Sequence, residues 1–250
     1  MLIDPQNSPP PQRLAENLAR IHARIRAAAL ESGRSVDQIT LIGASKGQSA
    51  AALKVALEAG LRDFGESYVQ DALPKMSALA ADVTPTWHFI GALQANKTRA
   101  VAENFAWVHA IDRLRIAERL AAQRPHHAPA LNVCVQVNIG AEGSKAGVAA
   151  SALRQLLRDI AVLPRLKLRG LMCLPPPEED PARQRYWLHQ LRELFESVNA
   201  DGAGLDTLSM GMSSDLEAAV HEGATLLRIG TALFGPRVAP PSPSHIQSAR

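Results

Sequence analysis

Eight short apolar segments recur along the chain, and helical patterns separate most of them. Their length and composition are typical of buried strands. The segments are 40–45, 63–66, 87–93, 107–111, 131–138, 166–174, 207–213 and 226–231. Strands that are joined through helices run parallel, because a parallel connection needs a crossover. In a chain of 250 residues, the pattern predicts an α/β fold that is one parallel (β/α)8 barrel of the TIM type. The alternative is an open, doubly wound sheet.

Helical patterns surround these segments and define the ends of the domain. Residues 12–32 show helical spacing and end before Gly33, which predicts an additional N-terminal helix. Ser151 is expected to cap a later helix. The last long helix is expected to bury Trp187, Leu191, Leu194 and Val198. Residues 1–11 and 238–250 are rich in Pro and Ser, so we expect disordered ends around a single domain over 12–237.

Composition excludes several classes of protein. The net charge is +3, but no basic and aromatic residues alternate in a way that would indicate nucleic-acid binding. No apolar run approaches the roughly 20 residues of a membrane span, and the N-terminus carries no secretory signal pattern. Cys134 and Cys173 lie in strand-like segments, which predicts reduced, buried thiols and a cytoplasmic location. No cysteine, histidine and aspartate cluster has metal-ligand spacing, so no metal is expected.

The predicted site lies where strands seven and eight end. Barrels of this type place their sites at the C-terminal ends of the strands, and the last two loops often hold phosphate. The seventh segment ends near Ser213, and the eighth continues into Gly230 and Thr231. Hydroxyls, small residues and backbone N–H groups suit a phosphate. The alternative for each alone is structural, with Ser213 capping a helix and Gly230 making a turn.

Two cations are expected beside this phosphate site. Side chains alternate along a strand, so Arg228 faces the same way as Gly230 and points toward the ligand from deeper in the barrel. Lys46 ends the first segment, which neighbours the eighth strand in a closed barrel. A lysine close to another cation is a nucleophile toward aldehydes. Together these residues predict pyridoxal 5′-phosphate (PLP) held as a Schiff base. The alternative for Lys46 is a strand end that simply reaches water.

The same residues lie in a series of motifs that resembles a known family. The motifs are GASK (43–46), FGESYVQ (64–70), WHFIGALQANKTR (87–99), AIDR (110–113), QVNIGAEGSKAGV (136–148), LRGLMCLP (168–175), LSMGMSSDLEAAV (208–220) and RIGTALFG (228–235). In this order they are similar to the PLP-binding homeostasis proteins, whose barrel is related to the N-terminal domain of alanine racemase. The resemblance covers residues 12–237.

The resemblance assigns roles to individual residues. It implies that Lys46 carries PLP as an internal aldimine, that Ser213, Gly230 and Thr231 bind the phosphate, and that Arg228 faces the pyridine nitrogen. It also implies a protein without established turnover that acts in PLP and amino-acid balance. Its partners are then PLP and the apo forms of PLP-dependent enzymes. A monomer is expected, because no long apolar stripe is left over on the helices.

Further positions complete the predicted cofactor site. Ser67 stands where this family usually has asparagine, so one hydrogen bond to the cofactor ring is expected to be lost or mediated by water. Met212 is expected to pack around the ring. His88 lies beside the expected barrel mouth and is included as a cofactor contact, with a satisfied core histidine as the alternative. Lys145 is either a second contact to PLP or a solvated loop charge.

Catalysis is the alternative to a carrier role. Racemisation at PLP needs two bases, one on each face of the substrate. In racemases that resemble this barrel, the second base is a tyrosine from another domain, which we do not expect in this chain. An arginine at the pyridine nitrogen also leaves the ring a weak electron sink. The prediction is therefore a carrier without catalytic residues, with a small amino-acid racemase as the alternative.

Overall fold

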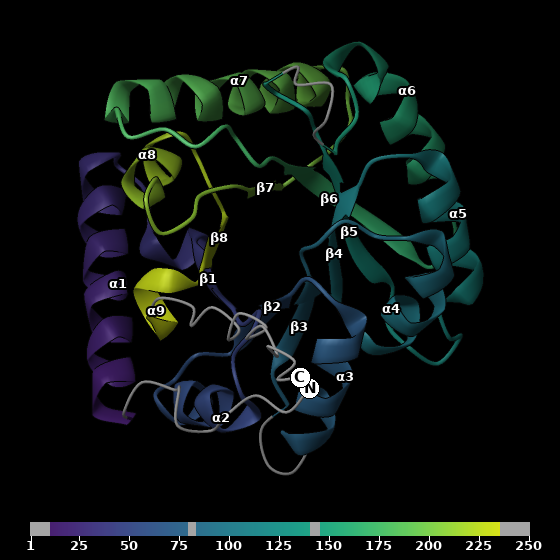
Figure 1. Cartoon of the computed structure of the whole chain (residues 1–250). Helices are drawn as coiled ribbons and strands as arrows, with labels where there is room; N and C mark the ends of the chain where they lie inside the picture. Colours follow the sequence, from purple (N-terminus) through teal and green to yellow (C-terminus); the bar gives the residue numbers. More distant parts are fainter. Residues whose placement is uncertain (1–10, 80–83, 141–145, 236–250) are drawn as a thin grey trace, which may run out of the picture.

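The computed structural model describes residues 11–79, 84–140 and 146–235. Within them, eight parallel strands form one closed barrel in chain order, and β8 returns to pair with β1 (Figure 1). The strands are β1 (Thr40–Ala44), β2 (Asp63–Glu66), β3 (Thr86–Phe89), β4 (Trp107–Ile111), β5 (Leu131–Gln136), β6 (Leu166–Met172), β7 (Thr207–Ser209) and β8 (Leu226–Ile229). The predicted TIM-type barrel is confirmed.

Helices surround the barrel in the order that the sequence predicts (Figure 1). They are α1 (Pro11–Glu31), α2 (Ala50–Glu58), α3 (Val69–Ala78), α4 (Thr98–Asn104), α5 (Leu114–Gln123), α6 (Ala150–Ala161), α7 (Pro181–Ala200), α8 (Leu216–His221) and α9 (Thr231–Phe234). Two 3₁₀ turns, η2 (Val36–Gln38) and η3 (Ala95–Lys97), complete the described elements. None of the described helices is long and apolar enough to cross a membrane.

The additional helix α1 packs against the segments that follow the last two strands. It packs against α2, α8 and α9, and its four predicted core residues Leu14, Leu18, Ile21 and Ile25 are buried (Figure 1). Asn17 donates to the carbonyl of Leu233 at 2.9 Å, and Arg24 donates to the carbonyl of Ser213 at 3.2 Å. The helix stops before Gly33, whose φ of 66° is one that glycine adopts freely.

Some local predictions differ from the structure. Strand β3 ends at Phe89 instead of residue 93, and β7 ends at Ser209 instead of residue 213. The chain turns at Gly211, where φ is 94° and a Cβ atom would lie 2.5 Å from the Cβ of Ala219. A close approach of that kind admits only glycine. The apolar residues after these strands therefore belong to loops at the barrel mouth.

Two helix predictions are wrong in detail. Ser151 lies inside α6, and Ala149 stands at the position before the helix. In α7 the buried stripe is Leu188, Leu191 and Val198, while Trp187 is half-buried beside the ring of Tyr186. Leu191 and Val198 are buried as predicted and Leu194 packs partly buried against the core, so Leu188 in place of Trp187 is the one difference in this stripe. The predicted disordered ends fall almost wholly in residues 1–10 and 236–250, which lie outside the described part of the chain, as does Lys145.

Candidate functional site

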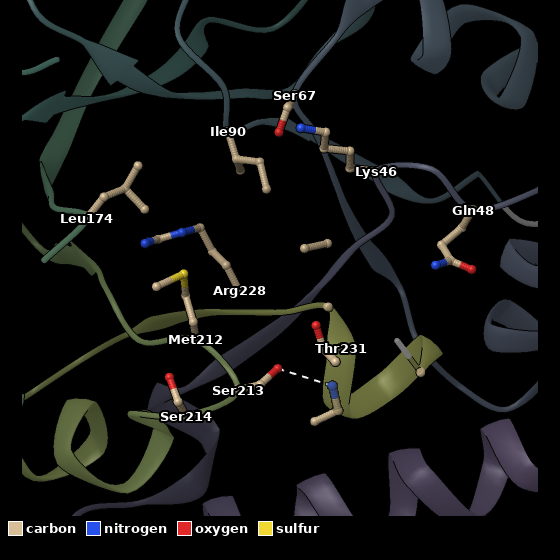
Figure 2. A pocket seen from close by; sticks show the side chains of 14 residues that line it. Lys46, Gln48, Ser67, Ile90, Leu174, Met212, Ser213, Ser214, Arg228 and Thr231 are labelled. Carbon is tan, nitrogen blue, oxygen red and sulfur yellow. Dashed lines mark hydrogen bonds between the residues drawn. The ribbon is translucent and has the colours of Figure 1, made fainter. Parts of the chain in front are cut away.

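A cavity of about 690 Å³ opens where the strands end. Its lining comes from the C-terminal ends of β1, β2, β3, β6, β7 and β8 and the loops that follow them (Figure 2). Seven of the predicted site residues line it: Lys46, Ser67, Met212, Ser213, Arg228, Gly230 and Thr231. The closed barrel is what brings them together, because β8 pairs with β1 and places the last strand beside the first.

Lys46 lies two residues beyond the end of β1, in a turn. Its Nζ atom is 3.4 Å from the hydroxyl oxygen of Tyr68 and 4.8 Å from the centre of the same ring. A half-exposed tyrosine is therefore its neighbour, and Figure 2 shows the side chain pointing along the cavity wall. Lys46 takes part in no ion pair among the residues that the structure describes.

A buried cluster holds the turn that carries Lys46. The hydroxyl of Ser45 donates to Oε1 of Glu66 at 2.6 Å, and Lys75 from α3 forms an ion pair with the same oxygen. Lys75 also donates to the main-chain carbonyl of Ser45 at 2.9 Å. All three side chains are buried. This cluster was not predicted, because an isolated lysine in a helix is typical of an exposed face.

The loops after β7 and β8 form the predicted phosphate side of the cavity. Ser213 accepts a 3.2 Å hydrogen bond from the backbone N–H of Ala232, drawn in Figure 2, so the two loops are linked. Asp215 accepts a 2.6 Å hydrogen bond from the N–H of Met212. Thr231 is exposed to the cavity, and a Cβ at Gly230 would lie 3.3 Å from the carbonyl of Ala44. Small residues and hydroxyls therefore meet at one rim.

Arg228 forms the floor of the cavity and is only 4% exposed. Its Nη1 donates to Oγ of Ser209 at 2.7 Å, and its Nη2 donates to the carbonyl of Cys173 at 2.9 Å. No carboxylate pairs with it among the described residues. Burial lowers the pKa of the Arg228 guanidinium from its usual value, against the attraction of Cys173 and Asp215. Arg228 therefore lies deep in the barrel and lines the same cavity as Gly230, as the alternation of side chains predicts.

His88 does not line the cavity. Its ring is buried inside the barrel, with Nε2 2.9 Å from Oδ1 of Asp63 and Nδ1 3.0 Å from Nε2 of His109. Ile90, two residues further along the chain, reaches the cavity instead. Side chains at 88 and 90 face the same way, and only the one nearer the strand end touches the mouth.

Several cavity residues were not predicted. They are Ala44, Gln48, Ile90, Leu174, Ser214, Ala232 and Gly235. Leu174 ends the predicted segment 166–174, so the rule that sites form at strand ends could have found it. Ile90 lies inside the predicted segment 87–93, and the observed end of β3 at Phe89 is what places it at the mouth. Across the described residues, no group of three or more His, Cys, Asp or Glu side chains is arranged to hold a metal ion.

Comparison with known proteins decides the family. The model of the alanine racemase N-terminal domain matches residues 12–238. The pyridoxal phosphate homeostasis protein of Pseudomonas aeruginosa is 54% identical over 224 residues, which is 90% of this chain and 96% of that protein. The protein of the same name from Escherichia coli K12 is 49% identical over 226 residues, 90% of this chain and 97% of its own length. The chain belongs to the pyridoxal phosphate homeostasis protein family.

Solved structures agree with this family. PipY of Synechococcus elongatus, solved with PLP bound, superimposes with a TM-score of 0.77 at 36% identity and covers 89% of this chain and 100% of PipY. Alanine racemase from Corynebacterium glutamicum superimposes with a TM-score of 0.64 at 13% identity, over 86% of this chain and 60% of the racemase. The racemase likeness extends to the fold alone.

Proposed function

We propose that the cavity binds PLP and that the protein acts in PLP and amino-acid homeostasis as a carrier. The observation that carries the proposal is the set of groups around one cavity: an amine, a guanidinium and four hydroxyls, with no carboxylate among the described residues that line it. An aldehyde, a ring nitrogen that accepts a hydrogen bond and a phosphate are complementary to these groups. The residues present therefore fit the cofactor.

Each group has a proposed role. Lys46 holds the aldehyde carbon of PLP as a Schiff base, and Arg228 donates to the pyridine nitrogen from the floor. Ser213, Gly230 and Thr231 receive the phosphate, while Met212 packs against the ring. Ser67 faces the cavity from the loop after β2 and bonds the ring through water, because its hydroxyl is shorter than an amide.

A carrier needs the cofactor held but not driven to react. PLP supplies an electron sink when its ring nitrogen is protonated. Arg228 has only N–H donors, so it keeps that nitrogen unprotonated. The apo forms of PLP-dependent enzymes are the proposed recipients. We also propose a monomer, and a cytoplasmic location that is supported by two cysteines, which are buried and unpaired in the described residues.

A small racemase is the second candidate. The observation that favours it is Tyr68, whose hydroxyl lies 3.4 Å from Nζ of Lys46. Racemisation needs bases on opposite faces of the substrate. Lys46 and Tyr68 come from neighbouring strand ends and lie side by side, which supports the carrier role instead.

The first experiment tests the Schiff base. Titration of the apoprotein with PLP is expected to produce the absorbance of a Schiff base. Borohydride reduction and peptide mapping are then expected to place the pyridoxyl group on Lys46. Lys46→Ala should lose the absorbance and Lys54→Ala, changed at an exposed helix position, should keep it. A pyridoxyl group on Lys54, Lys75 or Lys97 would overturn the assignment.

The second experiment separates carrier from enzyme. The PLP-loaded protein is mixed with an apo PLP-dependent enzyme, and recovery of that enzyme's activity is followed against free PLP at the same concentration. Transfer without racemisation of alanine supports the carrier. Racemase turnover by the wild type, read by chiral chromatography, would support the second candidate.

A further inference from the structure

Five inward-facing side chains form a continuous line of hydrogen bonds through the barrel. The line joins Asp63 to His88 at 2.9 Å, His88 to His109 at 3.0 Å, His109 to Oγ of Ser209 at 2.7 Å, and Ser209 to Nη1 of Arg228 at 2.7 Å. It begins at the first residue of β2, crosses from β4 to β7 and ends at the cavity floor. His88, His109, Ser209 and Arg228 are each at most 4% exposed.

The chemistry of the two ends fixes the direction of every hydrogen bond between them. Arg228 can only donate, so Oγ of Ser209 accepts from it. At the other end the Asp63 carboxylate can only accept, so Nε2 of His88 carries a proton. A neutral His88 then accepts at Nδ1, which requires a proton on Nε2 of His109. Nδ1 of His109 accepts in turn, and the hydroxyl of Ser209 donates to it.

Both imidazoles are held in the neutral form that this order requires. Burial lowers the pKa of His88, and the hydrogen bond and charge of Asp63 offset this only in part. Burial lowers the pKa of His109 well below its usual value, and the neighbouring His88 and Arg228 lower it further. The rings of His88 and Trp107 stack with centres 5.6 Å apart, which holds the His88 plane in place. Neutral histidine has one N–H and one acceptor nitrogen, as the line needs.

We propose that Ser209, His109, His88 and Asp63 are positioning residues that hold Arg228 in one orientation through this directed line. One N–H of Nη1 donates to Oγ of Ser209, and one N–H of Nη2 donates to the carbonyl of Cys173. The remaining N–H groups are then free to face the cavity. Asp63 places a carboxylate at the far end of the line, whereas no described residue that lines the cavity carries one. The effect of this line on PLP binding rests on the proposed function, whereas the positions of the protons along the line do not.

The proton order is tested without any cofactor. Long-range ¹⁵N–¹H correlation spectra of the apoprotein report the protonated nitrogen of each histidine ring. The 8 histidines are separated by comparison with His88→Gln and His109→Gln. Both rings are expected to be neutral with the proton on Nε2. A proton on Nδ1 of either ring, or a doubly protonated ring at neutral pH, would overturn the line.

Variants at the two ends test whether the line acts as a unit. Asp63→Asn keeps an acceptor oxygen but removes the charge, so the resonances of His88 and also of His109 are expected to move. An unchanged His109 would show that the line does not connect the two ends. Ser209→Ala removes the partner of Arg228 and is expected to weaken PLP binding about tenfold and to shift the absorbance maximum of the bound cofactor.

A matched control keeps this test specific. Thr98 is fully buried, and its hydroxyl is hydrogen-bonded to Ala95 and Arg119, which do not line the cavity, so Thr98→Val removes a buried hydroxyl outside the line. This variant is expected to keep the PLP absorbance and affinity of the wild type. Equal losses in Ser209→Ala and Thr98→Val would reduce Ser209 to a structural residue and overturn its positioning role. A wild type that shows the Nε2 protons but binds no PLP would overturn the proposed function alone.

Discussion

Lys75 donates a 2.9 Å hydrogen bond to the main-chain carbonyl of Ser45, the residue directly before Lys46. Lys75 is thus a structural residue, whereas Lys46 is the lysine that we propose binds PLP. Lys75 is 4% exposed and paired with Glu66, which is fully buried. The pair fixes the turn after β1 from behind, so the Lys46 side chain leaves the backbone at a rigid point.

The first prediction concerns this buried pair. Lys75→Met should destabilise the apoprotein by about 3–5 kcal/mol, because it leaves the Glu66 carboxylate buried without its cation. Urea unfolding measures the change, with Lys54→Met as the exposed control. The double variant Lys75→Met/Glu66→Leu should recover most of the loss. A double variant as unstable as the sum of the two single variants would show that the pair does not act together.

The second prediction concerns the loops that link β7 and β8. Replacing Ser213 and Thr231 together with alanine removes two hydroxyls from the proposed phosphate side. A hydrogen bond to a charged group contributes roughly 1.5–3 kcal/mol, so PLP affinity should fall by about 10²-fold or more. Titration by absorbance measures it, and Ser151→Ala, on the outer face of α6, is the control. Unchanged affinity would place the phosphate elsewhere.

The barrel and half of the residues that line the cavity could be predicted from the sequence. Parallel closure places the C-terminal ends of all strands at one edge, so Lys46, Ser213, Arg228 and Thr231 meet whatever their separation in the chain. Alternation predicts which side of the barrel a residue faces but not its depth. For this reason the sequence predicts His88 as a cavity residue, whereas Ile90 on the same face is the residue that lines the cavity.

Contacts between distant segments could not be predicted. Arg24 and Ser213 are 189 residues apart in the chain and come together only because α1 packs beside α8. The same holds for His109 and Ser209, which are 100 residues apart. Nothing in the local pattern around either residue carries this information, since a single polar residue in a strand or helix has no preferred partner.

The third prediction uses the contact between α1 and α8. The hydrogen bond from Arg24 lowers the pKa of Glu217. A carboxyl with a lowered pKa in the folded state stabilises the protein above its unfolded pKa, and this contribution is lost as pH falls through the folded value. Arg24→Met should therefore be less stable than the wild type at neutral pH by under about 1 kcal/mol, because the pair is partly exposed.

The pH dependence provides the check on this pair. The difference in thermal stability between wild type and Arg24→Met should shrink as the solution is acidified and Glu217 takes up a proton. Arg20→Met, at an exposed position one turn earlier on α1, should show no such trend. A difference that is constant from neutral to acid pH would mean that Arg24 acts through packing and its bond to the Ser213 carbonyl, not through Glu217.

The last prediction concerns the charge at the cavity floor. Arg228→Glu places a carboxylate where the ring nitrogen of PLP is proposed to lie, so that nitrogen can hold a proton and the ring becomes a stronger electron sink. The wild type should neither racemise alanine nor convert PLP to its amine form. Arg228→Glu, once loaded with PLP, should gain slow conversion to the amine form with amino acid. Cofactor absorbance and chiral chromatography follow both reactions.

A neutral variant separates the effect of the new negative charge from the effect of losing the arginine. Arg228→Gln also breaks the contacts to Ser209 and the Cys173 carbonyl, but it cannot stabilise a protonated ring nitrogen. It should bind PLP more weakly than the wild type and gain no conversion, because the amide oxygen of glutamine accepts a hydrogen bond but carries no negative charge to favour a protonated nitrogen. If Arg228→Glu and Arg228→Gln both fold, bind PLP and stay inert, the ring nitrogen is not what limits chemistry in this barrel. If both gain conversion, Arg228 restrains the cofactor by position, and its charge is not the cause.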